Sequence, residues 1–272
     1  VRRKRLRKRN RKRKRGCHAG VLFRLSKFPH KPSIPSIFLT SARSLTNKMD
    51  ELRLQIAKTK FIKNCYVLLI TETWLHSLIP DAAVELKGYI AHRQDRSRDS
   101  GNIKGGGLSL YVNKSWCINT KTVDSHCSMD LEYMTLKCRP IYLPQEFSMV
   151  LITTVYVPPD ANTTIALGFL HNIVSNQQNK YAHAVHIIVG DFNQADLKAV
   201  LPKFYQHVKC ATRGANILDK VYTNIKHGYK VIQLPHLGQS DHMSLLLAPA
   251  SGGIQIICQE VSARWYVLQG EM

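Results

Sequence analysis

The stretch Ile187-Ile188-Val189-Gly190-Asp191-Phe192-Asn193 decides the fold. Its continuous apolar run, bounded by turn residues, predicts a strand that is buried on both faces. Gly190 lets the backbone turn sharply or approach a ligand closely. Asp191 and Asn193 are two residues apart, so an extended backbone would point both side chains to one face, where they could orient a water and bind an anionic oxygen. The same residues are also ordinary in a polar turn, and the rest of the chain must decide between these interpretations.

Charge and composition favour a polyanionic partner. The chain has 272 residues, a net charge of +21 and 44% hydrophobic residues, which suits one large α/β domain with tails. Twelve of residues 1–15 are Lys or Arg and none is acidic, yet the remainder still holds 27 basic and 18 acidic residues, or +9. Nucleic acid is the expected partner, and a membrane surface is the weaker alternative because no amphipathic helix accompanies the basic run.

Cysteine usage and hydropathy exclude several classes of protein. The seven cysteines are odd in number and include no Cys-x-x-Cys pair, which indicates a reducing compartment and argues against a disulfide framework or a zinc module. No apolar run approaches the roughly 18 residues of a membrane span. The first residue is Val rather than Met, so we expect a fragment or a conceptual translation.

Three regions follow from the pattern along the chain. Residues 1–35 are predicted to be a basic, disordered leader and a proline-containing linker, residues 36–248 one domain, and residues 249–272 a tail without a pattern. Within the domain we predict strands at 36–40, 66–70, 108–112, 132–138, 149–157, 187–190, 218–223, 229–234 and 242–247. Helices are predicted from Met49, from 164 to 179 and from 195 to 204, and residues 80–104 are predicted to be a loop. This mixture predicts an α/β sandwich of two mixed sheets with helices outside.

Polar clusters stand at the ends of several predicted strands. The candidate residues are Glu72, Asp191, Asn193, Asp219, Ser240, Asp241 and His242. In a sandwich of two sheets such strand ends gather at one rim, where several carboxylates repel each other and need a cation. Oxygen ligands suit Mg²⁺, and the neighbouring histidine can carry a charge near neutral pH. Each residue alone also suits an ordinary turn or helix cap, but all of them together favour a site.

The order of these motifs resembles the endonuclease/exonuclease/phosphatase superfamily, and more closely the endonuclease domain of LINE-type (non-LTR) retrotransposons. The matching motifs are Ser41-x-Arg43-Ser44-Leu45, Thr71-Glu72-Thr73-Trp74, Tyr156-Val157-Pro158-Pro159, Gly190-Asp191-Phe192-Asn193, Leu218-Asp219 and Ser240-Asp241-His242. Arg93-x-Asp95-Arg96, Gly105-Gly106-Gly107, Trp116-Cys117, Lys137-Cys138-Arg139-Pro140 and Thr212-Arg213-Gly214 also resemble that group. The resemblance covers about residues 36–248 and is specific because the motifs appear in one order.

The resemblance implies a four-layered sandwich and Mg²⁺-dependent cleavage of phosphodiester bonds, with Mn²⁺ as an alternative metal. Glu72 would hold the metal, supported by Asp241 and by residue Ser41. The catalytic set would be Asp191 for the water, Asn193 and Tyr156 for the phosphate, and His242 oriented by Asp219. Arg43, Arg96, Thr212 and Arg213 would contact the nucleic acid. These roles agree with what hydrolysis requires: a positioned water, a Lewis acid and donors to the phosphate oxygens.

Three features depart from the family pattern. Ser41 stands where relatives usually carry Asn, and a shorter ligand can shift the geometry enough to cost about 100-fold in rate. Lys220 stands where close relatives tend to carry His. A reverse transcriptase domain follows in intact relatives but is absent here, so the resemblance implies a truncated element copy.

Three functions therefore compete. The first is a Mg²⁺-dependent DNA endonuclease, nuclear or in a cytoplasmic particle before import, with RNA as a further partner of the basic leader and no membrane partner. The second is a catalytically impaired nucleic-acid-binding relic, which Ser41 and the truncation favour. The third is a phosphatase or lipid phosphodiesterase of the same superfamily, against which the basic charge argues.

Overall fold

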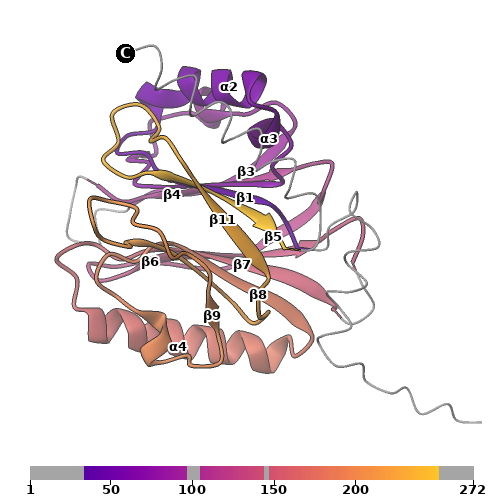
Figure 1. Cartoon of the computed structure of the whole chain (residues 1–272), viewed down its shortest axis with the longest axis vertical. Helices are drawn as coiled ribbons and strands as arrows, with labels where there is room; N and C mark the ends of the chain where they lie inside the picture. The colour runs from indigo at the N-terminus through magenta and orange to yellow at the C-terminus, as the bar shows by residue number, and fades with distance from the viewer. Residues whose placement is uncertain (1–33, 97–104, 144–146, 251–272) are drawn as a thin grey trace, which may run out of the picture.

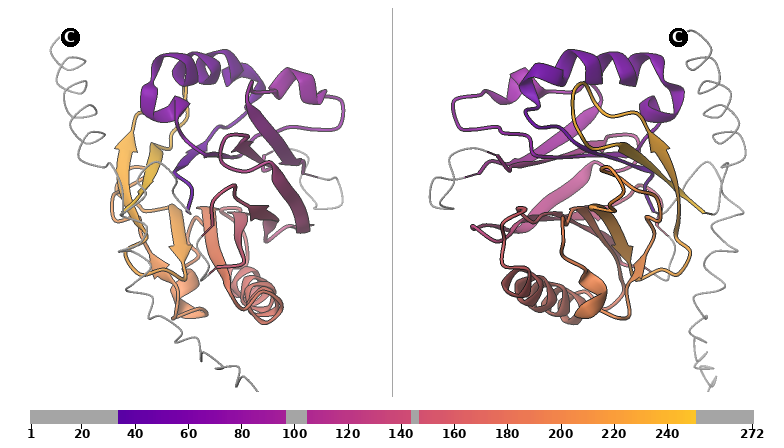
Figure 2. Two further views of the ribbon diagram at one scale, coloured as in Figure 1. Left: turned by 90° about the vertical axis from the view of Figure 1, so that its right-hand side faces the viewer. Right: turned by 60° about the vertical axis from the view of Figure 1, so that its left-hand side comes forward.

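The computed structural model describes residues 34–96, 105–143 and 147–250, and the predictions for the basic leader and for the tail beyond residue 250 lie outside them. Two six-stranded sheets pack face to face, and helices cover the outer face of each (Figure 1). The helices α2 (Met49–Lys58) and α3 (Lys60–Lys63) lie on one outer face and α4 (Thr163–Lys180) on the other. The turned views in Figure 2 show the same order of layers. The predicted fold, a four-layered α/β sandwich, is confirmed.

Sheet A is mixed because β1 and β2 run parallel while its other neighbouring strands pair antiparallel. Its strands, in spatial order, are β11 (Tyr229–Leu234), β12 (Ser244–Pro249), β1 (Ile37–Ser41), β2 (Val67–Thr71), β4 (Leu108–Asn113) and β3 (Tyr89–Gln94). The connection from β1 to β2 passes through the short η1 (Thr46–Lys48) and then α2 and α3, as a parallel pair requires.

Sheet B is also mixed, since β7 and β8 run parallel and are joined through α4. Its strands, in spatial order, are β5 (Asn119–Cys127), β6 (Glu132–Arg139), β7 (Met149–Tyr156), β8 (Ala184–Asp191), β10 (Asp219–Thr223) and β9 (Tyr205–Gln206). The central strand β8 is buried along its whole length, as the apolar run predicts. The Asn162 side chain accepts hydrogen bonds from the first turn of α4 and fixes where that helix begins.

The alternation of side chains along each strand separates the core between the sheets from the cores under the helices. On β8, Ile187 and Val189 point into the inter-sheet core, whereas Ile188 packs in the cluster under α4. On β1, Leu39 points between the sheets and Phe38 packs under α2. Since side chains on a strand alternate between its two faces, residue 191 continues the inward-facing set of β8. The polar end of the strand is thereby aimed at the rim of the inter-sheet core.

The structure differs from the predicted elements at three places, and two of these differences arise from polar edge strands. Residues 80–104 are not one loop, because they contain the 3-10 helix η2 (Asp81–Val84) and the edge strand β3. The predictions also missed β5, another edge strand with a largely polar sequence. Edge strands face solvent and often carry polar residues, so they lack a hydrophobic pattern. The predicted helix at 195–204 is reduced to η4 (Leu197–Ala199), which Asp196 caps.

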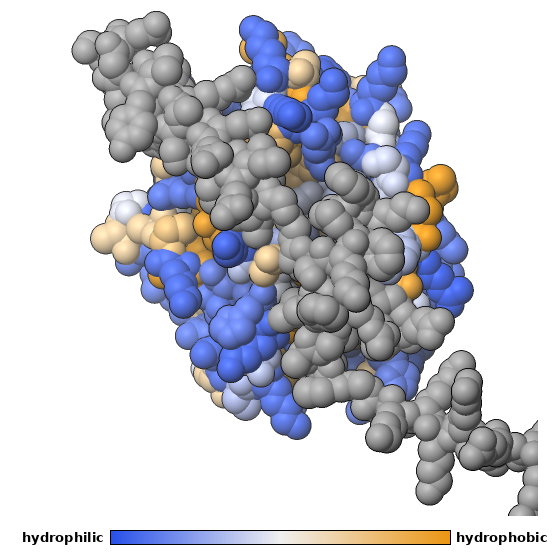
Figure 3. All heavy atoms as spheres, turned by 45° about the vertical axis from the view of Figure 1, so that its right-hand side comes forward, coloured by the Kyte–Doolittle hydropathy of each residue, from blue (hydrophilic) through white to orange (hydrophobic). Residues whose placement is uncertain are grey.

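On the face shown in Figure 3 the visible side chains are mostly hydrophilic, with isolated hydrophobic residues among them. Among the described residues, no helix has the length and apolar character needed to cross a membrane.

Candidate active site

One polar row crosses sheet B at the rim of the inter-sheet core. Glu132 on β6 lies opposite Tyr156 on β7, Tyr156 lies opposite Asp191 on β8, and Asp191 lies opposite Asp219 on β10. These four residues, called the polar row below, are between 0% and 4% exposed. Residues paired across neighbouring strands share a face of the sheet. The register of four strands therefore brings three carboxyl groups and a phenol into one line facing sheet A.

Sheet A meets the polar row mainly with residues that follow or precede its strands. Glu72 lies just beyond the end of β2, and its carboxylate accepts a hydrogen bond from the Tyr156 hydroxyl at 3.4 Å. The Gly107 amide, just before β4, donates to Glu132 Oε2 at 2.7 Å. Ser41 at the end of β1 lies opposite Thr71 in the register, and its hydroxyl is buried. The predicted residues Ser41, Glu72 and Tyr156 therefore converge at one rim.

Asp191, His242 and Asp219 form a buried cluster at the centre of the rim. His242 Nδ1 and Asp219 Oδ2 are 2.7 Å apart and share a hydrogen bond, while His242 Nε2 lies 3.9 Å from Asp191 Oδ2. The Ser240 hydroxyl accepts from the His242 amide and donates to the Ser41 carbonyl, which ties the turn before β12 to β1. A carboxylate on Nδ1 fixes the orientation of the ring and leaves Nε2 directed at Asp191.

The charges of this cluster are set by burial and by mutual interaction. Burial, followed by repulsion from Asp219, raises the pKa of Asp191 to about 8, although His242 acts in the opposite direction. Burial lowers the pKa of His242, but the hydrogen bond to Asp219 and the nearby carboxylates outweigh it and raise that pKa to about 9. Burial also raises the pKa of Glu72, against opposing effects of His242 and Arg43. His242 is therefore a cation at neutral pH beside carboxyl groups that hold protons easily.

The turn after Asp191 does not continue as an extended strand, so the prediction that Asp191 and Asn193 share a face through strand geometry is wrong. Asn193 has a φ of 45°, and its backbone amide donates to Asp191 Oδ1 at 3.1 Å. Its side-chain nitrogen donates to the Val157 carbonyl at 2.8 Å. Gly190 is required for the approach of β7, since a Cβ there would lie 1.8 Å from the Val155 carbonyl oxygen. A tight turn, not the alternation of a strand, holds Asn193 at the site.

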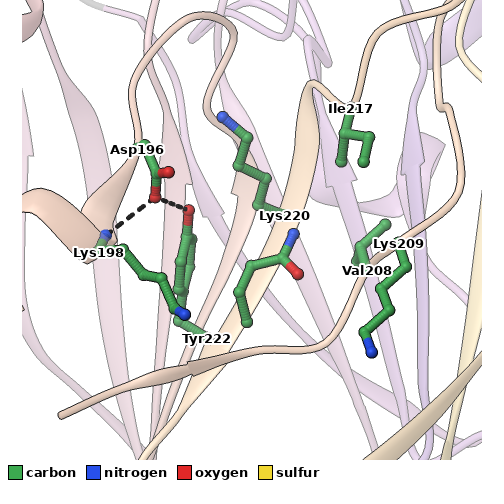
Figure 4. A pocket seen from close by; sticks show the side chains of 8 residues that line it. Asp196, Lys198, Val208, Lys209, Ile217, Lys220 and Tyr222 are labelled. Atoms are coloured by element: carbon green, nitrogen blue, oxygen red, sulfur yellow. Dashed lines mark hydrogen bonds between the residues drawn. The ribbon is translucent and has the colours of Figure 1, made fainter. Parts of the chain in front are cut away.

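Lys220 supports this turn from the opposite face of β10. Its Nζ donates to the carbonyl oxygens of Ala195 at 2.6 Å and Asn193 at 3.3 Å. Burial lowers its pKa. Figure 4 shows Lys220 beside the hydrogen bonds that Asp196 accepts from the Tyr222 hydroxyl and from a backbone amide, around a shallow pocket of about 450 Å³. The residue that departs from the family pattern therefore braces the backbone of Asn193.

The predicted metal residue Asp241 lies in an exposed cluster of charges. Its Oδ2 is 2.6 Å from the Arg213 guanidinium and 3.4 Å from that of Arg43, whose side chains are 46% and 48% exposed. Burial acts to raise the pKa of Asp241, but a backbone hydrogen bond and the two arginines outweigh it and lower that pKa. The exposed guanidinium groups of Arg43 and Arg213 fit their predicted role as contacts for a polyanion.

The other two predicted nucleic-acid contacts, Arg96 and Thr212, are less accessible. The Arg96 side chain is 6% exposed, and its Nε lies 3.2 Å from Glu132 Oε1. Thr212 is fully buried, and its hydroxyl accepts from the amides of Leu218 and Asp219 at 3.0 and 3.1 Å. Both side chains support the polar row, Arg96 at Glu132 and Thr212 at the backbone of Asp219.

The oxygen atoms at the rim are suitable ligands for a hard divalent cation. Among the described residues, the buried atoms Ser41 Oγ, Asp191 Oδ2 and Asp219 Oδ1 lack a hydrogen-bond partner. A ligand atom from each of Asp191, Asp219 and His242 lies within 4.8 Å of the others. The 2.7 Å distance between His242 and Asp219 is that of a hydrogen bond, which leaves Glu72 and Ser41 on sheet A as residues that could hold a divalent cation. Oxygen donors of this kind, completed by water, are those that Mg²⁺ prefers.

Glu132 and Trp74 are site residues that the sequence predictions did not select. Glu132 is fully buried, and burial raises its pKa to about 7 against the opposing effects of the Gly107 amide and Arg96. Its sequence signal is a single carboxylate at the first position of an apolar strand, which becomes informative only with the register to Tyr156. Trp74 lies two residues beyond Glu72 with its side chain 41% exposed.

Comparisons with known proteins support the fold. No protein-family model and no curated protein sequence matches the chain. Among solved structures, the endonuclease domain of TRAS1, a telomere-specific non-LTR retrotransposon, is 12% identical with a TM-score of 0.57 and covers 81% of this chain and 100% of its own. A 3′ phosphatase from Neisseria, bound to a product DNA hairpin, is 14% identical with a TM-score of 0.52 and covers 79% and 99%.

An endonuclease/exonuclease/phosphatase family protein from Leptotrichia buccalis is 12% identical, with a TM-score of 0.55, and covers 79% of this chain and 99% of its own. These identities carry information about the fold alone. The resemblance found in the sequence is thus confirmed at the level of structure: this chain is similar to a retrotransposon endonuclease domain and has the endonuclease/exonuclease/phosphatase fold.

Proposed function

We propose that this chain is a metal-dependent endonuclease that hydrolyses DNA phosphodiester bonds, of the kind encoded by LINE-type retrotransposons. The observation that carries the proposal is the polar row facing Glu72 and His242 across the two sheets. The Asp191 oxygen Oδ2, which is buried and lacks a hydrogen-bond partner among the described residues, lies near a cationic imidazole and a carboxylate from the opposite sheet. Phosphodiester hydrolysis requires a base, a stabiliser of negative charge and a Lewis acid in that arrangement.

Each side chain has a task that its surroundings support. Asp191 Oδ2 would orient the attacking water and, once ionised beside the His242 cation and a bound metal ion, would accept its proton. His242 would donate from Nε2 to a non-bridging phosphate oxygen, with Asp219 holding its orientation and charge. The second N–H of the Asn193 side-chain amide and the Tyr156 hydroxyl would contact the phosphate. When bound at Glu72 and Ser41, Mg²⁺ would supply Lewis-acid stabilisation of the negative charge.

The surface charge supports a nucleic acid substrate. The chain carries a net charge of +21, and exposed Arg43 and Arg213 lie beside the rim. Such groups bind phosphates without reading the base sequence. A run of Lys and Arg like that in residues 1–15 also acts in nuclear import or RNA binding, and we propose a nuclear location on that ground. The chemistry of the Neisseria neighbour, a phosphatase bound to DNA, supports DNA rather than a lipid.

The test is nicking of supercoiled plasmid by the full chain, with and without Mg²⁺. We expect nicking that EDTA abolishes, and Asp191→Asn should lower the rate on the order of 1,000-fold, since it removes the base. Glu85→Gln, which removes an exposed carboxylate that follows η2 and lies outside the polar row, should nick like the parent. Equal nicking by Asp191→Asn and the parent would refute the assigned site.

The second candidate is an impaired, nucleic-acid-binding relic of the same domain. It is favoured by Ser41, whose hydroxyl is buried without a hydrogen-bond partner among the described residues and is shorter than the Asn side chain of relatives. If the parent binds DNA without nicking it and Ser41→Asn nicks, the relic is the correct function. Release of phosphate from a 3′-phosphorylated oligonucleotide or a phosphoinositide, without nicking, would instead identify a phosphatase.

A further inference from the structure

Trp74 is a large aromatic side chain exposed beside the candidate active site. It is 41% exposed, whereas Trp116, the other tryptophan in the described part of the chain, is 4% exposed. Aromatic rings bury a large apolar area, and a ring left half exposed retains a face that a planar ligand can cover. No role in the proposed hydrolysis uses this ring.

The backbone that carries Trp74 is held on both sides. On one side, the amides of Ser44 and Leu45 donate to the carbonyl oxygens of residues 72 and 73 at 3.0 and 2.9 Å. On the other side, the Thr73 amide donates to the Gly107 carbonyl at 3.2 Å and the Trp74 amide to residue 106 at 3.0 Å. Trp74 itself has a φ of 54°. The backbone that presents the ring is therefore hydrogen-bonded on both sides, so little backbone entropy is lost when a ligand covers the ring.

Trp74 is two residues from Glu72, so its ring lies near the position proposed for the scissile phosphate. Glu72 and Trp74 are both accessible at the rim, whereas Thr73, the residue between them, is 1% exposed. The Trp74 amide donates to the Gly106 carbonyl, and the adjacent Gly107 amide donates to Glu132 of the polar row, so the backbone of Trp74 is held beside that row. Glu72 in turn accepts from Tyr156 of the polar row. A phosphate bound there would leave its neighbouring nucleoside within reach of the indole.

We propose that the Trp74 indole is a stacking platform for a nucleobase next to the scissile phosphate. The ligand class is a nucleobase that has left its own stack, so the preferred substrate is a single strand, a junction or a distorted duplex. Stacking on an aromatic ring is tolerant of base identity because every base presents a π face. Exposed arginines on the same rim would hold the backbone while the ring holds the base. This inference rests on the proposed function and adds the form of its substrate.

The experiment combines variants of the protein with an abasic substrate. A single-stranded oligonucleotide is first cleaved by the parent with Mg²⁺ to map the site, and an abasic residue is then placed on either side of it. Trp74→Leu should lower kcat/KM on the intact strand about ten-fold or more, and one abasic position should lower the parent equally. On that abasic strand Trp74→Leu and the parent should be equal, because the ring has no base to contact.

Two further variants control for folding and for exposed aromatic surface. Trp74→Phe keeps a π face and should retain most of kcat/KM. Phe169→Leu removes an aromatic ring of similar exposure, 48%, from α4 and should behave like the parent. Binding of the intact strand in EDTA should quench tryptophan fluorescence in the parent, and Trp74→Phe should lose that quenching.

An equal loss for Trp74→Leu on intact and abasic strands would overturn the proposal, because the ring would then act through Glu72. Unchanged kcat/KM in Trp74→Leu would overturn it as well. Failure of the proposed function looks different: the parent would not cleave, or Asp191→Asn would cleave normally. In a parent that binds without cleaving, the fluorescence arm still tests stacking, and the absence of a difference between the parent and Trp74→Phe would refute it.

Discussion

The two sheets contribute to the site in different ways. Sheet B supplies the polar row from within its strands, where the pairing of β6, β7, β8 and β10 fixes every neighbour. Sheet A supplies Glu72, Asp241 and His242 from the turns beyond its strands. Glu72 has a φ of 50°, a backbone conformation that an L-residue adopts at some cost. Asp191, the proposed base, is thus held by sheet pairing, whereas Glu72 and His242 are held by turns.

The difference teaches where the chain tolerates change. A residue inside a paired, buried strand can hardly move without disturbing the register, so substitutions there should alter stability and activity together. An exposed residue in a turn at the rim, such as Arg213, is partly solvated, and its substitution should affect binding more than folding. Four substitutions or conditions test this contrast, beginning with the largest expected effect.

Adding one methyl group at Gly190 should disrupt the pairing of β7 with β8. Gly190→Ala would place a Cβ 1.8 Å from the Val155 carbonyl oxygen on the neighbouring strand, so β7 and β8 would have to separate. We expect a loss of about 3 kcal/mol or more in the free energy of unfolding, measured by urea denaturation. Gly168→Ala in α4 meets no atom within 4 Å and should be neutral or stabilising by up to about 1 kcal/mol. Similar denaturation curves for the two variants would contradict the assigned register.

The contact between the two sheets should depend on pH. Because the pKa of His242 is raised to about 9, its stabilising effect is complete below its ordinary pKa of about 6.5 and is lost as pH rises through 9. The metal-free protein should therefore show a fall in Tm between pH 6.5 and 9 in thermal unfolding. Asp219→Asn removes the hydrogen-bonded carboxylate and should flatten this fall. A pH profile in Asp219→Asn as steep as that of the parent would exclude His242 as its source.

Function and stability should oppose each other on the strand side. Asp191 holds a buried oxygen without a hydrogen-bond partner among the described residues, and repulsion from Asp219 raises its pKa. Asp191→Asn removes that charge, so at about pH 9, where the Asp191 carboxyl is ionised, the metal-free variant should be more stable by about 1–2 kcal/mol in urea denaturation. The same variant should lose nicking. Mg²⁺ should raise the Tm of the parent more than that of the variant. A less stable variant would indicate that the carboxylate is satisfied in the free protein.

The turn side should give the smallest effect on stability. Arg213→Gln removes one of two exposed arginines that contact Asp241, so the free energy of unfolding should change by less than about 1 kcal/mol. Binding of a DNA duplex should weaken, and the slope of log Kd against log salt should decrease by about one phosphate contact. Lys230→Gln, at an exposed position of β11 away from the rim, is the matched control and should leave the slope unchanged. An unchanged slope in both variants would remove Arg213 from the DNA-binding surface.

The buried strands and the amphipathic helices could be predicted, because burial leaves a pattern in the sequence. Ile187 to Val189 and Leu68 to Ile70 read as strands without any knowledge of their neighbours. Strands β3 and β5 could not be predicted, because each pairs on one side only and carries mostly polar residues. Residues 195–204 are predicted as a helix, but only η4 forms there, capped by Asp196, while Lys220 binds the carbonyl of Ala195.

The sequence by itself determined the two mixed sheets, the central strand that ends at Asp191 and the list of polar residues near its end, because hydrophobic periodicity and motif order are local properties. Only the tertiary structure decided which of these residues meet. Strand register joined Glu132 and Tyr156 to Asp191, left-handed turns placed Asn193 and Trp74, and ion pairs drew Asp241 to two arginines and Arg96 to Glu132. Contacts between residues distant in the chain depend on pairing across strands, which leaves no signal in the spacing of either partner.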